Sequence, residues 1–401
     1  MSIGMSINQL KSITAYRPSQ SSETKDYYNL ETLPTPFALI SLDKLERNTQ
    51  MMASRAHRLD VKLRPHVKTH KTIEGARLQV KGHFGGITVS TLAEAEVYAD
   101  YGFTDITYAV PITPSKMSRV IALTKRLEAF HVLVDHEDMV KVLTERSHQA
   151  QTCLSVLIKV DCGYGRAGVS VDDPKLLTLA QRIDAEPWLN FAGILTHGGH
   201  AYNCRNRKEI QKVAAEEYQA IIQARDLLQA QGISSDIVSL GSTPTATVFD
   251  NLKGVTEMRP GNYALFDEFQ ASIGSCSVSD IALSVITEVI AYYPDRQELL
   301  IDAGALALSK DEGAMHINEV LTYGRIFDLH DRQQSHLALV GLSQEHGKVK
   351  IHSSHEAQDI KIGDRLRIYP NHSCLVTALY DHIYIQRGKE VIDRWLPIKG
   401  W

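Results

Sequence analysis

The sequence predicts an α/β protein built as a (β/α)8 TIM barrel followed by a second, mostly β C-terminal domain. Three observations support this prediction. Extended apolar runs alternate with helical patterns at steps of about 20 to 40 residues. Polar motifs follow most of these runs at the point where each strand would end, which is where barrels carry their chemistry. After about residue 270 the helical patterns stop and short alternating runs take over.

Eight extended runs supply the predicted barrel strands. Helical patterns lie between most of them, at residues 71–80, 92–101, 115–127, 137–146, 174–184 and 208–231. Strands that alternate with helices in this way form parallel sheets, and eight of them favour a closed barrel. An open doubly wound sheet is the alternative, but no GxGxxG motif follows any run. The runs are residues 61–67, 86–90, 105–110, 131–135, 154–161, 191–197, 236–241 and 255–259.

The domain boundaries follow from these patterns. We expect residues 37–270 to form the barrel domain, in which a short apolar strand at residues 37–40 and a helix at residues 43–59 precede the eight runs. Residues 271–401 form the β domain. The polar arm of residues 1–36 either packs with that domain or remains loosely held, and the sequence leaves both open.

Composition narrows the class of partner. Lys and Arg number 43 and Asp and Glu number 47, which gives a net charge of −4 and argues against nucleic acid or a membrane surface as partner. No apolar run reaches the length of a membrane span, and the N-terminal stretch lacks the pattern of a signal peptide. The five cysteines include no CxxC pair, so we expect a reduced, cytoplasmic protein.

Lys68 is the candidate nucleophile. It lies in the segment Leu-Arg-Pro-His-Val-Lys-Thr-His-Lys-Thr, between an expected strand and a helix capped by Thr69 or Thr72. The segment carries four further basic residues, Arg64, His66, His70 and Lys71. Neighbouring cations disfavour the protonated form of a lysine amine and make it usable as a nucleophile or base. Taken alone, the segment also fits a solvated basic turn.

Two later strand ends could hold a phosphate group. Gly241, Ser242 and Thr243 directly follow the seventh expected strand, and Gly261 and Asn262 follow the eighth. Glycine allows close approach of the backbone to an anion, while hydroxyl and N–H groups supply donors. The late strands of barrels often bind phosphate. Capped strand-to-helix turns explain the same residues equally well.

Two more motifs are weaker on their own. The Gly-rich loop at residues 161–168 lacks the Lys-Ser/Thr of a P-loop, but it would let Arg166 turn back over the barrel mouth to hold a carboxylate or a ring nitrogen. His372 and Cys374 follow an expected strand, and on an extended chain residues i and i+2 point to the same side. An imidazole and a thiolate make half of a zinc site with open positions for water or substrate. An exposed turn and a buried apolar cysteine are the plainer alternatives.

Taken together, these motifs resemble the fold-type III pyridoxal-phosphate enzymes, and more narrowly the D-serine dehydratase and D-threonine aldolase group. The resemblance covers most of the chain and includes the lysine segment, Ser90 to Glu96, His197 to His200 and the His-x-Cys pair. It implies a Schiff base between Lys68 and pyridoxal phosphate, with Arg166 near the pyridine nitrogen and Tyr202 near the ring. It further implies that the phosphate lies at the two late strand ends and that zinc binds His372 and Cys374.

Within this group the residue at the second metal position favours one activity. Aldolases are similar in carrying His-x-Asp there, whereas dehydratases carry His-x-Cys, so Cys374 favours the dehydratases. The resemblance then implies dehydration of a small D-3-hydroxyamino acid such as D-serine to a 2-oxo acid and ammonia, by a homodimer. Two alternatives remain: a metal-dependent aldolase acting on D-threonine or 3-hydroxy-D-aspartate, and a non-catalytic pyridoxal-phosphate carrier. The carrier is less favoured because such relatives lack the β domain.

Overall fold

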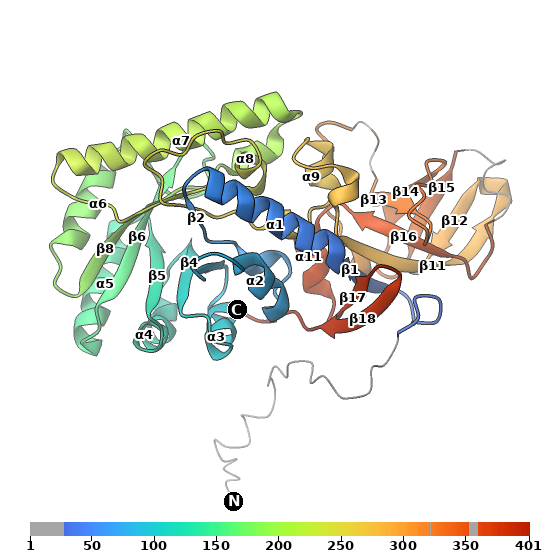
Figure 1. Ribbon diagram of the computed structural model, residues 1–401, viewed down its shortest axis with the longest axis horizontal. Helices are drawn as coiled ribbons and strands as arrows, with labels where there is room; N and C mark the ends of the chain where they lie inside the picture. Colours follow the sequence, from blue (N-terminus) through green and yellow to red (C-terminus); the bar gives the residue numbers. More distant parts are fainter. Residues whose placement is uncertain (1–27, 319, 321, 353–359) are drawn as a thin grey trace, which may run out of the picture.

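The computed structural model describes residues 28–318, 320, 322–352 and 360–401, and Figure 1 shows two β-sheets arranged along the long axis of the chain. One sheet is parallel and surrounded by helices, and the other is formed mainly by the C-terminal strands. Helix α1 (Leu42–Arg58) lies where the two parts meet. This arrangement confirms the predicted barrel and the mostly β second domain.

The barrel strands follow one another in the order β2-β10-β9-β8-β6-β5-β4-β3, and all neighbours pair in parallel. An isolated parallel bridge between His66 and Thr88 joins the first strand to the second. The strands are β2 (Lys62–Leu63), β3 (Ile87–Val89), β4 (Asp105–Pro111), β5 (Ala129–Val134), β6 (Leu154–Asp161), β8 (Leu189–Leu195), β9 (Ile237–Leu240) and β10 (Glu257–Met258), while β7 (Val169–Ser170) pairs only with β6.

The helices begin at polar caps that the sequence supplies. Thr91 and Glu94 form a capping box at the start of α3, and the Asn206 side chain accepts from two backbone N–H groups at the start of α7. The Thr72 side chain caps α2, as expected for one of the two candidate caps. The barrel helices are α2 (Ile73–Val80), α3 (Leu92–Asp100), α4 (Met117–Arg126), α5 (Glu137–Ala150), α6 (Lys175–Asp184), α7 (Arg207–Ala230) and the short α8 (Thr243–Ala246).

The second sheet begins with a strand from the N-terminal side of the barrel. Strand β1 (Phe37–Ser41) pairs antiparallel with β11 and parallel with β17. This segment was predicted to belong to the barrel domain, but its pairing places it in the second sheet. The remaining strands are β11 (Leu283–Tyr293), β12 (Glu298–Ile301), β13 (Gly324–Phe327), β14 (Leu337–Leu342), β15 (Gly347–Ile351), β16 (Arg365–Pro370), β17 (Ile383–Arg387) and β18 (Glu390–Trp395).

Short segments connect and cover these strands. The described part of the arm packs on the β domain, where the Tyr28 ring lies 5.1 Å from the Tyr384 ring and the Arg365 guanidinium donates to the Leu30 carbonyl at 2.6 Å. Residues 1–27 of the expected arm lie outside the described residues. Three short helices, α9 (Glu268–Ser272), α10 (Ala305–Leu308) and α11 (Ser373–Leu379), belong to this half of the chain. No helix in the described ranges is both long and apolar enough to cross a membrane.

Candidate active site

Lys68 lies in a short 3-10 helix, η2 (Val67–Thr69), between β2 and α2. The His66 ring caps this turn, because its Nδ1 accepts from the Lys68 N–H at 3.4 Å while its Nε2 lies 3.3 Å from the Ser90 hydroxyl. Burial, followed by the positive charge of Lys68, holds the pKa of His66 well below its usual value, so the ring is neutral. The Lys68 side chain is exposed, and its amine makes no hydrogen bond or ion pair with any described residue.

The other basic residues of this segment do not crowd Lys68 in the way its sequence suggests. Arg64 points into the barrel, where it binds Glu257 at 2.7 Å and Asp105 at 2.5 Å. The Lys71 amine pairs with Glu94 at 2.8 Å. Both charges are therefore matched by carboxylates, whereas His66 contacts the lysine turn directly through the Lys68 N–H.

The two late strand ends come together as expected. Gly261 packs directly against the lysine turn, since a Cβ there would lie 2.6 Å from the His66 carbonyl oxygen. The Tyr263 N–H donates to the Thr243 hydroxyl at 3.1 Å and so joins the two strand ends. Among the described residues, the N–H groups of Thr243 and Asn262 donate to no acceptor, and the buried Asn262 Oδ1 has no partner.

Gly241 contributes differently from the way the sequence analysis assumed. Its N–H is already donated to the buried Glu217 carboxylate at 3.0 Å, and the same carboxylate oxygen accepts from the Gly198 N–H at 2.5 Å. The φ angle of Gly241 is +112°, a value that favours glycine. Gly241 therefore shapes this turn and offers no free N–H group.

His197 follows β8 and faces the same region. Its Nδ1 lies 3.2 Å from the Gly241 carbonyl, which can only accept, so Nδ1 carries the proton and Nε2 is the free acceptor. Burial, followed by the charges of Lys159, Lys68 and Arg166, holds the pKa of His197 well below its usual value. His197 is therefore a neutral imidazole within electrostatic reach of Lys68.

The Gly-rich loop folds around Asp161 at the end of β6. The Asp161 carboxylate accepts from the N–H groups of Gly163, Tyr164 and Gly165 at 2.9 to 3.1 Å. The Arg166 guanidinium stacks over the Tyr164 ring at 5.0 Å and acts electrostatically on His197. Arg166 is exposed, and its charge reaches His197 at the end of β8.

Lys159 is a buried amine at the same end of the barrel. Burial, followed by the charge of Arg259, lowers the pKa of Lys159 from 10.5 to about 7. Its amine makes no hydrogen bond or ion pair with a described residue. Burial also lowers the pKa of the neighbouring Arg259 to about 10.

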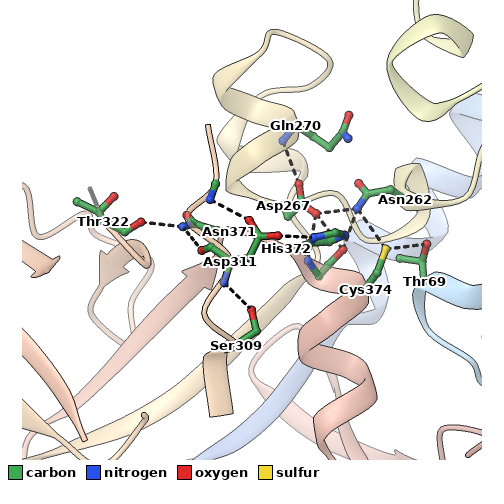
Figure 2. A network of polar contacts seen from close by, with 12 residues as sticks. Thr69, Asn262, Asp267, Gln270, Ser309, Asp311, Thr322, Asn371, His372 and Cys374 are labelled. Carbon is green, nitrogen blue, oxygen red and sulfur yellow. Dashed lines mark hydrogen bonds and ion pairs between the residues drawn. The ribbon is translucent and has the colours of Figure 1, made fainter. Parts of the chain in front are cut away.

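His372 and Cys374 lie together at the start of α11 (Figure 2). His372 is the N-cap residue and Cys374 is already helical, so the expectation of an extended chain is wrong. The chain turns into a helix there because Asp267 accepts from the Ser373 N–H at 3.0 Å and from its hydroxyl at 3.2 Å. The His372 and Cys374 side chains nevertheless interact. The sequence predicted this proximity from an extended chain, whereas the structure achieves it at the start of a helix.

The two side chains shift each other's pKa. Burial opposes the thiolate, but the hydrogen bond and positive charge of His372 outweigh burial and lower the pKa of Cys374. Burial likewise opposes the imidazolium, yet hydrogen bonds to Asp311 and Cys374 raise the pKa of His372 to about 11. Within the described residues there is no group of three or more His, Cys, Asp or Glu that could hold a metal.

Tyr202 lies beside this pair. Burial, followed by the negative charges of Cys374 and Asp267, raises the pKa of Tyr202, so its phenol remains protonated. Its ring is 5.8 Å from the Phe269 ring. The structure therefore places Tyr202 within electrostatic reach of the Cys374 side chain.

Several residues of this region were not identified from the sequence. His197 belongs to a motif that the sequence analysis quoted, and its position at a strand end could have marked it. Lys159 was detectable as a lysine inside an apolar strand. Glu217 and Asp311 carry no local signal, because each acts on backbone or side chains far away in the sequence.

The barrel, the β domain and the strand-end lysine together define an alanine racemase-like enzyme of fold-type III. Residues 40–268 match the family model described as alanine racemase, N-terminal domain, and residues 282–386 match the model of a serine dehydratase domain. The chain belongs to the D-serine dehydratase and D-threonine aldolase family. Enzymes of this fold and the D-serine dehydratases use pyridoxal phosphate, and the relatives named below are lyases.

Two relatives are similar over nearly their whole length. D-threo-3-hydroxyaspartate dehydratase of Delftia sp. (strain HT23) is 35% identical over 376 residues, which cover 93% of this chain and 99% of that protein. D-serine dehydratase of Dictyostelium discoideum is 35% identical over 399 residues, which cover 93% and 98%.

Solved structures agree with this assignment. The Delftia enzyme superposes with a TM-score of 0.90 at 35% identity, covering 93% of this chain and 100% of that one. A variant of that enzyme with a cysteine replaced by alanine was solved in a metal-free form. D-threonine aldolase of Filomicrobium marinum has a TM-score of 0.80 at 26% identity, covering 92% and 96%.

Proposed function

We propose that this chain dehydrates a small D-3-hydroxyamino acid such as D-serine to a 2-oxo acid and ammonia, using pyridoxal phosphate on Lys68 and zinc on His372 and Cys374. One observation carries the proposal. The Cys374 thiol lies 3.4 Å from the Thr69 hydroxyl, so the His372–Cys374 pair faces the turn that carries the free lysine. A substrate attached near Lys68 would present its β-substituent toward this pair.

The residues at the barrel mouth fit pyridoxal phosphate. Unbonded N–H groups at Thr243 and Asn262, together with the Ser242 and Thr243 hydroxyls, would hold the phosphate, while Gly241 and Gly261 provide the close backbone approach. Arg166 would contact the pyridine nitrogen, and Tyr202 would lie near the ring.

The metal pair fits zinc better than magnesium or calcium. A thiolate is a soft ligand, and an imidazole whose Nε2 faces that sulfur completes a combination that zinc prefers. Because only two protein side chains take part, water or substrate oxygens would fill the other positions. When bound, zinc supplies Lewis acidity for loss of the β-hydroxyl group.

The chain's own residues then have separate tasks. Pyridoxal phosphate, when bound, supplies the electron sink that lets an amino acid lose its Cα proton. The Lys68 amine takes that proton. Arg166 does not protonate the pyridine nitrogen of the cofactor, because a guanidinium keeps its own proton. Departure of the β-hydroxyl as water leaves an enamine, which hydrolyses to the 2-oxo acid and ammonia. Neutral His66 and His197 flank the amine without adding positive charge.

An aldolase acting on D-threonine or 3-hydroxy-D-aspartate is the second candidate, because a similar aldolase structure exists. In that reaction the same metal pair would assist deprotonation of the hydroxyl, and the Cα–Cβ bond would break. A product assay with D-serine, D-threonine and D-threo-3-hydroxyaspartate separates the two. We expect 2-oxo acid and ammonia, whereas glycine and an aldehyde as main products would contradict the dehydratase assignment.

We also propose that the chain forms a homodimer in the cytoplasm. Leu375 and Leu379 on α11 are exposed next to the metal pair, which supports a partner subunit that covers the site and excludes water. All five cysteines are free, as expected in a reducing compartment. Sedimentation at assay concentration tests the dimer, and a fully active monomer would refute it.

A further inference from the structure

Asp311 contacts the proposed metal ligand His372 from the side opposite Cys374 (Figure 2). Its carboxylate oxygen Oδ2 lies 2.9 Å from the imidazole Nδ1. The two side chains are only partly accessible, at 26% for Asp311 and 35% for His372. Because a carboxylate can accept but not donate here, Nδ1 carries the proton, and Nε2 is the ring nitrogen left for a metal.

Asp311 is itself held in place by a network of hydrogen bonds. Its second carboxylate oxygen accepts from the Gly313 N–H at 2.8 Å, and its own N–H donates to the Ser309 hydroxyl at 3.3 Å. The Asn371 amide donates to the Asp311 carbonyl at 2.9 Å and to the Thr322 carbonyl at 2.7 Å. Asn371 directly precedes His372. His372 and Asp311 are therefore connected twice, through their side chains and through the Asn371 amide.

We propose that Asp311 is a positioning residue of the metal site, which fixes the proton on Nδ1 of His372 and turns Nε2 toward Cys374. The inference rests on the metal site proposed above. Ligating histidines that donate their second N–H to a carboxylate are held in one tautomer and orientation, and the ring becomes a stronger ligand. This matters more in a site with two protein ligands than in one with four, because each ligand carries a larger share of the affinity.

Direct ligation by Asp311 is the competing arrangement. It is disfavoured because Oδ2 is engaged by the imidazole and the other oxygen by Gly313, and because the described residues contain no cluster of three metal-binding side chains. An asparagine at position 311 separates the two arrangements. Its amide oxygen can still accept from Nδ1, but it would bind a metal less well than a carboxylate.

The test is zinc affinity, measured by competition with a chromophoric chelator on the full-length protein loaded with its cofactor. Asp311→Ala should weaken zinc binding by about 10- to 100-fold. Asp311→Ser, which keeps a group that can accept from Gly313, should show the same loss and serves if the alanine variant does not fold. Asp311→Asn should retain most of the affinity. Glu312→Ala, which removes an exposed carboxylate from the same loop, should bind zinc as the wild type does.

Cobalt substitution adds a second readout. The visible absorption bands of bound cobalt should be the same in wild type and in Asp311→Asn, because the ligands are unchanged. Changed bands together with a loss of affinity equal to that of the alanine variant would identify Asp311 as a ligand and overturn its positioning role. Zinc binding as tight as that of the wild type in Asp311→Ala or Asp311→Ser would overturn it as well. If the wild-type protein binds no zinc, the proposed metal site itself is refuted, and the positioning role of Asp311 is refuted with it.

Discussion

The Thr377 hydroxyl donates to the Thr69 carbonyl at 2.6 Å, and this hydrogen bond joins helix α11 of the β domain to the turn that carries Lys68. Thr377 lies one helical turn beyond Cys374, and both residues contact Thr69. The Lys68 turn and the proposed metal ligands are therefore held at a fixed separation by adjacent contacts on one residue. The site belongs to the junction between the two domains rather than to the barrel alone.

Lys68→Ala should abolish covalent attachment of pyridoxal phosphate. The Lys68 amine is exposed and unpaired, and no other described lysine lies on this turn with a free amine, since Lys71 is bound to Glu94. After dialysis, the variant should lose the visible absorbance of the lysine-bound cofactor. Lys62→Ala, on the preceding strand, should keep it. A covalent adduct that borohydride still traps in Lys68→Ala would show that another residue carries the cofactor.

Cys374→Asp should weaken dehydration and increase cleavage of the Cα–Cβ bond. A carboxylate is a harder ligand than a thiolate, so the site should lose its preference for zinc in favour of manganese or magnesium. Zinc content per chain, and the ratio of 2-oxo acid to glycine from D-threonine, are the measurements. Cys153→Ala removes an exposed cysteine and should change neither. An unchanged product ratio in Cys374→Asp, with full activity after zinc removal, would leave a reaction at Lys68 that needs no metal.

Glu217→Ala should destabilise the fold. The carboxylate joins the turns after β8 and β9, and its loss leaves the buried N–H groups of Gly198 and Gly241 without an acceptor. We expect a loss of about 2 to 4 kcal/mol in the free energy of unfolding. The neighbouring Glu216, whose side chain is 45% exposed, provides the matched control, and Glu216→Ala should change stability by less than about 0.5 kcal/mol. Equal urea midpoints for the two variants would argue against this role.

Lys159 predicts a specific dependence of stability on pH. Its pKa is lowered from 10.5 to about 7 in the folded chain, so between these values the unfolded chain binds one more proton than the folded chain. The free energy of unfolding then rises with pH across this window, by up to about 1.4 kcal/mol per pH unit. Below pH 7 both states are protonated, and the full penalty of burying the charge applies.

The measurement is urea unfolding of wild type and Lys159→Met at pH 7, 8 and 9. Wild type should gain stability relative to the methionine variant at each step, because the variant has no proton to lose. Lys212→Met, at a side chain that is 80% exposed, should run parallel to the wild type. Parallel curves for Lys159→Met would mean that Lys159 titrates normally in the folded protein.

Much of the fold was predictable because the barrel part of the chain repeats one unit, a strand followed by a helix. Each barrel strand reads as an apolar run that ends in a polar motif, and caps such as Thr72 and Thr91 mark where helices begin. The β1 segment was misassigned for a physical reason: a short apolar strand looks the same whichever sheet it joins. Its partners are decided by pairing with residues near the opposite end of the chain.

In the candidate site, too, features set by local motifs were predictable, and features set by distant residues were not. Lys68, Cys374 and the late glycines were found because they lie in compact motifs at the ends of strands. The helical conformation at Cys374 was missed because it depends on Asp267, which lies 106 residues before Ser373. The roles of Arg64 and Lys71 were overestimated for the same reason, since their charges are matched by the distant residues Glu257 and Glu94.

The pairing of β1 has a consequence for synthesis on the ribosome. Leu39 emerges early, yet its sheet neighbours Ser284 and Tyr384 are translated only after the barrel. The barrel can close while the nascent chain is still attached, whereas β1 stays unpaired until β11 emerges and gains its second neighbour only with β17. A chain that terminates before residue 283 would therefore leave an apolar strand exposed at its own N-terminal side, which marks incomplete products for capture by chaperones or for degradation.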